Sequence, residues 1–209
     1  MVQNPRQFAG ARLGATFAFL LFFGAACQTP QPVNVNANFV STPAFNTRSP
    51  SQVAVLPIED GTADGAIQRH LTLLRQEVMR QLPSRLYTPL TASAVDAALT
   101  TVPAPAAGES ILVPATLQKL AGHAAEDAVL ALRVDRWDEG RLMVDKTVWF
   151  QFQAALVGSD GVQLWSGTIA GEVKAGGLGP SPRDKDGMAR SCAELAVREM
   201  MLRMPRRAP

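Results

Sequence analysis

The sequence is poor in the side chains that most often carry chemistry. Its 209 residues include only two histidines, His70 and His123, and they do not form a His-x-x-x-His pair. The two cysteines, Cys27 and Cys192, are far apart and too few for a disulfide framework. Cys192 falls on the apolar side of a helical pattern, which is typical of a small core residue. We therefore expect no metal site and no cofactor.

The motifs of the common enzyme classes are also missing. No Gly-x-Ser-x-Gly elbow is present, and the glycine-rich stretch 175–180 lacks the Gly-Lys-Ser/Thr ending of a phosphate-binding loop. The adjacent acids Glu126 and Asp127, and the pair Asp184 and Asp186, could serve glycoside hydrolysis only if they faced each other across a cleft. Solvated turn acids are the simpler interpretation, so the sequence predicts a protein that is not an enzyme.

The charge balance leaves no basic surface for nucleic acid. Residues 1–26 carry Arg6 and Arg12 and no acid, so 18 of the 20 basic residues face 18 acids in the remainder. Binding along a phosphate backbone needs clustered positive charge. The only basic cluster is the C-terminal tail around Arg206, which we interpret as a frayed, solvated end. We expect no nucleic-acid partner.

The one long apolar run lies at the N-terminus. Arg6 and Arg12 precede fourteen uncharged residues, Leu13–Ala26, which end in small side chains. This run is shorter than the roughly 20 residues that a membrane-spanning helix needs, and it has no polar face for a core helix. A basic start, a short apolar segment and small residues before a cleavage point are typical of a secretory signal. Residues 1–26 are therefore predicted to be a signal peptide.

Cys27 refines this prediction. The stretch GAAC resembles the lipobox of bacterial lipoproteins, in which the cysteine is acylated and becomes the new N-terminus. The motif usually has Leu three residues before the cysteine, where this chain has Gly24, so cleavage with a free Cys27 stays an alternative. Because Gln28 is not Asp, the resemblance implies anchoring of Cys27 in outer-membrane lipid, with the protein on the periplasmic face.

The next segment is predicted to be a tether. Residues 28–51 contain four prolines, four asparagines and one charge, Arg48, without a sustained period. With the lipidated cysteine, residues 27–51 would form a flexible tether able to extend about 80 Å. The folded periplasmic domain is then expected to span residues 52–205.

Periodicity within residues 52–205 predicts an α+β fold. Strands are expected at 53–58, 86–90, 128–137, 147–157 and 162–173, and helices at 67–82, 92–99, 114–123 and 189–204. The Asp-Gly pair in Gly158–Gly161 is typical of a tight hairpin turn. Leu164 and Trp165 are adjacent in an alternating strand, so we expect them on opposite faces. We predict a single domain with a mixed sheet, an antiparallel C-terminal meander, and helices packed on one face.

These elements resemble a known family. The resemblance is carried by the stretches VAVLPI and DAVLALRVDRW and by the hairpin SDGVQLWSGTIAG. The D-G-x-x-L-W-S-G pattern of this hairpin includes Asp160, Gly161, Leu164, Trp165 and Gly167. The chain resembles bacterial lipoproteins of unknown function that are encoded beside curli-secretion-channel-like lipoproteins. That group is similar to penicillin-binding-protein activator lipoproteins and to the amino-terminal domain of the Tol propeller protein. The resemblance covers about residues 50–175 and implies a non-enzymatic envelope module.

The expected function is docking. An auxiliary subunit of an envelope transport or secretion assembly would bind envelope proteins, or a second copy of itself, through a sheet edge or the neighbouring loops. Pro57 indicates that the strand at 53–58 ends or lies at an edge. Two alternatives stay open: a lipoprotein that binds peptidoglycan or lipid, and a periplasmic hydrolase with an unrecognised site.

Overall fold

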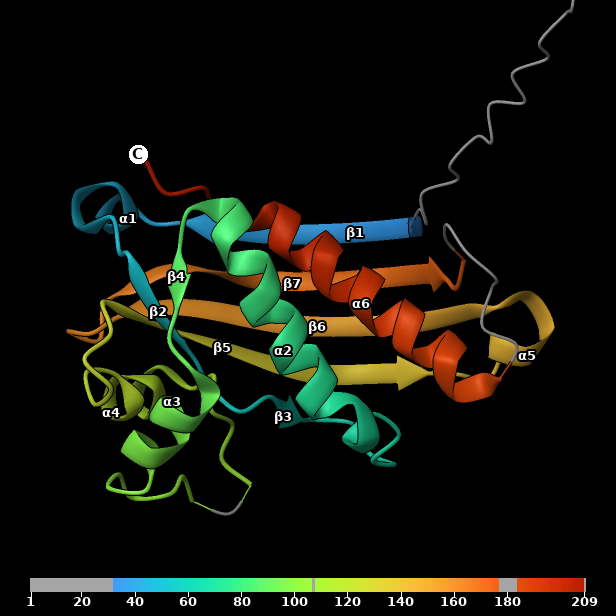
Figure 1. Ribbon diagram of the computed structural model, residues 1–209, viewed down its shortest axis with the longest axis horizontal. Helices are drawn as coiled ribbons and strands as arrows, with labels where there is room; N and C mark the ends of the chain where they lie inside the picture. The colour runs from blue at the N-terminus through green and yellow to red at the C-terminus, as the bar shows by residue number, and fades with distance from the viewer. Residues whose placement is uncertain (1–31, 107, 177–183, 209) are drawn as a thin grey trace, which may run out of the picture.

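One mixed sheet carries the domain in the computed structural model, which describes residues 32–106, 108–176 and 184–208 (Figure 1). The strand order is β1-β7-β6-β5-β2-β4, and β3 pairs with β5 beyond the end of β2. The strands β1, β7, β6 and β5 are antiparallel, whereas β2, β3 and β4 join them in parallel. The bounds are β1 Pro32–Ser41, β2 Gln52–Val55, β3 Glu59–Asp60, β4 Thr88–Pro89, β5 Ala128–Asp138, β6 Thr147–Gly158 and β7 Gln163–Lys174. The predicted α+β class and antiparallel C-terminal meander are confirmed.

Two long helices lie across one face of this sheet (Figure 1). These two helices are α2, which follows the 3-10 turn η1, and α6. The short helices α3 and α4 pack against the other face of the sheet, beside β2 and β5. The bounds are α1 Pro43–Arg48, η1 Gln68–His70, α2 Leu71–Gln81, η2 Leu82–Arg85, α3 Ala92–Leu99, α4 Pro114–Leu120, α5 Leu142–Asp145 and α6 Lys185–Arg203. The helices therefore cover most of one face of the sheet and part of the other, rather than one face alone.

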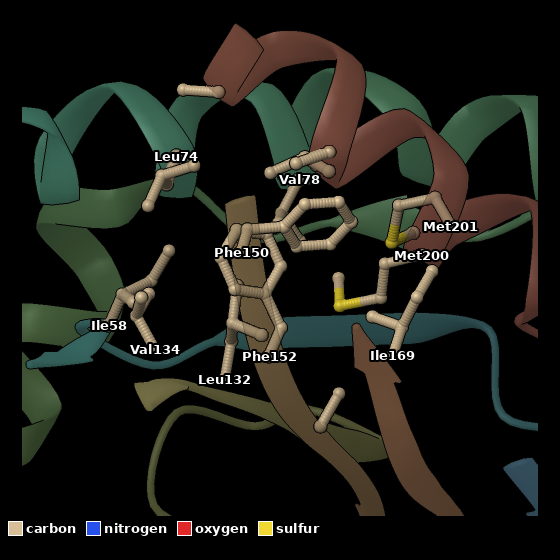
Figure 2. Packing of buried hydrophobic residues seen from close by; sticks show 14 of the residues in the cluster. Ile58, Leu74, Val78, Leu132, Val134, Phe150, Phe152, Ile169, Met200 and Met201 are labelled. Atoms are coloured by element: carbon tan, nitrogen blue, oxygen red, sulfur yellow. The ribbon is translucent and has the colours of Figure 1, made fainter. Parts of the chain in front are cut away.

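The main core fills the space between the sheet and the helices α2 and α6 (Figure 2). Phe150 and Phe152 point to this face from alternate positions of β6, and their ring centroids are 4.9 Å apart. Leu74 and Val78 of α2, one helical turn apart, pack against them and are fully buried. Each such buried apolar side chain stabilises the fold by about 1.5–3 kcal/mol.

The predicted tether is wrong for residues 32–48, which belong to the folded domain. Residues 32–41 form β1, which is hydrogen-bonded antiparallel to β7. Phe39 stacks on Trp165 with ring centroids 4.5 Å apart, and Phe45 of α1 is buried in the core. These contacts and the ladder of backbone hydrogen bonds offset the low strand propensity of the asparagines.

The strand predicted at 53–58 is shorter and lies inside the sheet. It ends at Val55, before Pro57, and β5 and β4 flank it on its two sides. Val53 and Val55 contact the main core, whereas Ala54 contacts the second cluster beneath α3 and α4. Burial on both faces is confirmed, and Pro57 marks a strand end rather than a sheet edge.

A bulge in β7 changes the predicted direction of two side chains. Trp165 pairs with Leu156, but the next pair joins Gln163 to Val157, so Leu164 is an extra residue. A bulge of this kind lets neighbouring side chains share a face. Leu164 and Trp165 accordingly both lie in the main core, at 0% and 1% exposure, and the expectation of opposite faces is wrong.

The C-terminal tail is bound to the domain rather than frayed. Met204 is buried, Tyr87 Oη donates a 2.9 Å hydrogen bond to the Pro205 carbonyl, and the Arg207 N–H donates to the Arg85 carbonyl. Burial raises the pKa of Tyr87, so the phenol stays protonated and keeps this bond. The tail therefore helps to fix η2 and β4 against the rest of the fold.

Candidate interaction surface

The adjacent acids Glu126 and Asp127 hold loops in place. Glu126 is buried and accepts hydrogen bonds from the N–H groups of Gly122 and Ala124, at 2.6 and 2.7 Å. Asp127 accepts two from backbone N–H groups at the start of β2, at 2.8 and 2.9 Å, and these bonds lower its pKa. Both carboxylates therefore accept backbone hydrogen bonds that fix the loops around them.

The acids at the start of α6 are structural as well. Asp184 accepts a 2.6 Å hydrogen bond from the Gly187 N–H and so caps the helix, and Asp186 pairs with Arg69 at 2.9 Å. An acidic cap and an acid in the first turn stabilise a helix through its dipole.

His70 lies in a buried polar cluster at the start of α2. Arg69 Nε donates a 3.1 Å hydrogen bond to His70 Nε2, which must therefore be unprotonated. Burial and the neighbouring Arg69 charge lower the pKa of His70. Burial opposes ionisation of the nearby Glu139, but hydrogen bonds from Trp137 Nε1 and Arg69 outweigh it and lower the pKa of this carboxyl. Since Lys185 also pairs with Glu139, the cluster joins α2, β5 and α6.

A pocket of about 680 Å³ borders this cluster and is lined by acids of β5 and of the loop before η1. Asp135 lines it; its Oδ1 accepts from Arg133 Nε at 2.8 Å, while its Oδ2 is buried without a hydrogen-bond partner among the described residues. No group of three His, Cys, Asp or Glu side chains in the described part of the chain could hold a metal ion.

The second histidine and the second cysteine are both engaged locally. His123 Nε2 lies 2.9 Å from the Lys119 carbonyl, at the end of α4. Cys192 is fully buried, and burial raises the pKa of its thiol to about 12. A thiol this far from ionisation is a poor nucleophile, so Cys192 is the small core residue that its helical position predicted.

The two edges of the sheet differ sharply. On one edge β3 and β4 have two residues each; β3 carries two acids and β4 contains Pro89. Short length, charge and proline are the usual devices that prevent an edge strand from pairing with another chain. The other edge is β1, ten residues long without a charge, and its single proline, Pro32, is at its first position. Among the residues that the structure describes, β1 is therefore the edge that is open to an added strand.

The backbone groups available on β1 can be assigned. The Asn34 and Asn38 carbonyl oxygens point to β7, where they would overlap a Cβ placed on Gly171 or Gly167. The Thr42 N–H also points this way and donates to the Leu164 carbonyl at 2.9 Å. Because both backbone groups of a residue point to the same side and successive residues alternate, Val35, Ala37 and Phe39 direct theirs away from the sheet. An irregularity between Pro32 and Asn34 interrupts the alternation at the start of the strand.

The same odd-numbered residues carry an apolar row. Val35, Ala37 and Phe39 face the main core below α6, yet all three are only half-buried, because no strand within the described ranges lies beyond them. The even-numbered Asn34, Asn36 and Asn38 are exposed on the opposite face. An added strand would therefore find free hydrogen-bonding groups and an incompletely covered apolar row together.

The edge strand β1 was not predicted from the sequence, because residues 28–51 were interpreted as a tether. The signal for it is in the sequence: Val33, Val35, Ala37 and Phe39 alternate with three asparagines, which is the period of a half-buried strand. Asparagine and proline are rare in strands, and this composition hid the alternation.

No protein-family model matches the chain, and no curated protein matches it in sequence. Solved structures do resemble it in fold. The lipoprotein GNA1162 from Neisseria meningitidis is 20% identical with a TM-score of 0.44, covering 72% of this chain and 98% of that chain. The PelC dodecamer from Paraburkholderia phytofirmans is 17% identical with a TM-score of 0.42, over 77% and 94% of the two chains. The LpoB C-terminal domain from Salmonella enterica is 17% identical with a TM-score of 0.36, over 59% and 82%. The chain is thus structurally similar to these bacterial proteins at low sequence identity.

The predicted signal peptide and the acylation site Cys27 lie outside the described residues. Within the described ranges, no helix is both long and apolar enough to cross a membrane.

Proposed function

We propose that the chain is an outer-membrane lipoprotein whose periplasmic domain works without catalysis, by docking onto another envelope polypeptide through the β1 edge. The observation that carries this proposal is the contrast between the two described sheet edges, since β1 is long and uncharged and has no proline after its first residue, Pro32. Natural proteins protect such an edge unless a partner covers it.

Strand addition supplies both affinity and selectivity at this edge. A partner strand would receive hydrogen bonds from the outward N–H and C=O groups of Val35, Ala37 and Phe39, and it would extend the apolar cover over their side chains. Because residues 32–41 carry no charge, the partner strand meets no electrostatic barrier on β1 itself.

The anchor would hold this edge close to the bilayer. Acylation of Cys27 leaves only five residue steps to Pro32, the first residue of β1. Five steps span at most about 18 Å, far less than the roughly 80 Å available if residues 28–51 were all flexible. The domain would therefore dock partners next to the membrane surface.

The test uses the full-length chain in intact cells, followed by cross-linking and mass spectrometry of its partners. Ala37→Pro removes an outward N–H, which β7 does not use, so the domain should keep its fold while strand addition fails. Asn38→Pro is the matched control, since it removes an N–H that faces β7 and should lower the melting temperature.

A charge placed beside the edge gives an independent check. Asn36→Lys should reduce partner capture, whereas Thr168→Lys, exposed on the same face but in the interior strand β7, should not. Unchanged capture by folded Ala37→Pro would contradict docking at β1. A chain that captures no protein but hydrolyses a cell-wall or ester substrate would favour an enzyme instead.

A further inference from the structure

We propose that the strand added to β1 is β1 of a second copy, antiparallel, with Ala37 of each copy on the two-fold axis. This inference rests on the proposed function, because it names the partner of the same edge. An interface of this symmetry is made by one patch meeting itself, so every pair of residues occurs twice.

The direction of the backbone groups permits this register. In an antiparallel pair, hydrogen bonds form where outward-facing residues of the two strands are opposite each other. With Ala37 opposite its own copy, Val35 lies opposite Phe39 of the second copy. All of these are odd-numbered residues, whose N–H and C=O groups point away from β7. Three residues per chain would exchange about six interstrand hydrogen bonds.

The side chains are complementary in the same register. On the helix-covered face, Val35 meets Phe39 of the other copy and the small Ala37 side chains meet at the axis. On the open face, the amide of Asn36 meets the amide of Asn38. Moving the axis to Asn38 would oppose Asn36 to Val40 and Val35 to Ser41, which mixes polar with apolar side chains.

Charge favours a second copy as the occupant. Two identical surfaces bring identical charges together across a two-fold axis, and like charges opposite each other are unfavourable. The strand β1 carries no charge, and the first charged residue after it is Arg48, beyond the strand end. The half-buried Val35, Ala37 and Phe39 would become covered from both sides.

The arrangement is also compatible with two anchors in one leaflet. Symmetry-related points lie at the same height along a two-fold axis, so both Pro32 residues reach the same level when the axis is normal to the bilayer. In this register Pro32 lies opposite position 42, and the two strand starts would be about 34 Å apart.

Disulfide trapping tests the register directly, with the full-length chain in intact cells under mild oxidation. Residues opposite each other in a hydrogen-bonded antiparallel pair have Cα atoms about 5.5 Å apart, which is within the disulfide range. Ala37→Cys should therefore give a covalent dimer. The wild-type chain, with Cys27 and Cys192, is the baseline, and Val144→Cys, 84% exposed on α5, is the control. Neither should give a covalent dimer.

Paired charges on the open face provide a second test that does not depend on oxidation. The N36K/N38K double variant places lysines opposite lysines and should weaken dimerisation at least tenfold at low salt. The N36K/N38D variant places lysine opposite aspartate at both symmetric positions and should restore dimerisation. The readout is the dissociation constant from light scattering of the purified full-length chain in detergent, with melting temperature as the check on folding.

The outcomes separate this inference from the proposed function. A monomeric wild-type chain, or no Ala37→Cys dimer, would overturn self-association even if Ala37→Pro still abolished capture of a different envelope protein. Equal dimerisation of the two double variants would overturn the register. If Ala37→Pro changed neither dimerisation nor capture, the edge itself would not be a binding site and both proposals would fall.

Discussion

Replacing Trp165 with alanine should strongly destabilise the domain, because this side chain joins β1 to the rest of the sheet. Trp165 is 1% exposed, stacks on Phe39 and pairs with Ser41 of β1. Truncating a buried tryptophan costs about 3–5 kcal/mol, and loss of an aromatic pair adds about 0.5–1.5 kcal/mol. For a domain of this size, each kcal/mol lowers the melting temperature by roughly 2–4 °C. The melting temperature should therefore fall by between about 7 and 26 °C.

Thermal and urea unfolding would measure this loss, with Trp149→Ala as the matched control. Trp149 is half-buried on the open face, where the Arg136 guanidinium lies 4.2 Å from its ring centroid. An exposed cation–π contact contributes only about 0.5–1 kcal/mol, so the control should shift the melting temperature by a few degrees at most. Hydrogen exchange of β1 amides should also rise selectively in Trp165→Ala. Equal destabilisation by the two variants would refute the reasoning.

Three further changes have defined outcomes. Cys27→Ala should move the protein out of the membrane fraction and abolish labelling by a palmitate analogue; a wild-type chain that takes up no label would disprove the anchor. Gly167→Ala should loosen β1, seen as a lower melting temperature, because the added Cβ would overlap the Asn38 carbonyl oxygen, whereas Gly176→Ala has no atom within 4 Å of its Cβ and should be neutral. Burial lowers the pKa of His70 below 6.5, so the unfolded state takes up the proton before the folded state does. The contribution of His70 to the free energy of unfolding should therefore be complete above about pH 6.5 and decline as the pH falls below it. In urea titrations at several pH values, His70→Gln should remove this part of the pH dependence.

Local periodicity was sufficient for the elements with strong patterns. Alternation at 147–157 and helical spacing at 189–204 predicted β6 and α6 closely, because both bury one regular face in the main core. The position of β1 at the edge of the sheet could not be predicted in the same way. The partner of β1 is β7, and a pairing between such distant segments leaves no trace in either local pattern.

One error and one question that the sequence left open have particular physical causes. The bulge at Leu164 interrupts the alternation of side chains between the two faces of the sheet. No side chain around Trp165 indicates that β7 contains an extra residue at this point. Pro57 correctly indicated the end of β2, but a proline after a strand does not say whether that strand is central or at an edge. Edge position depends on the order of all the strands, which is a property of the whole fold.

The pairing of β1 with β7 also sets the order in which the domain can be completed. Asn38 pairs with Thr168, which is 130 residues later in the chain (168 − 38 = 130). Synthesis at about 5–20 residues per second would separate the appearance of these two residues by roughly 6 to 26 seconds. During that interval β1 has no native neighbour on either side, and contacts between distant segments are in any case slow to form. The first strand to be synthesised can therefore take its place only after the last one has been made.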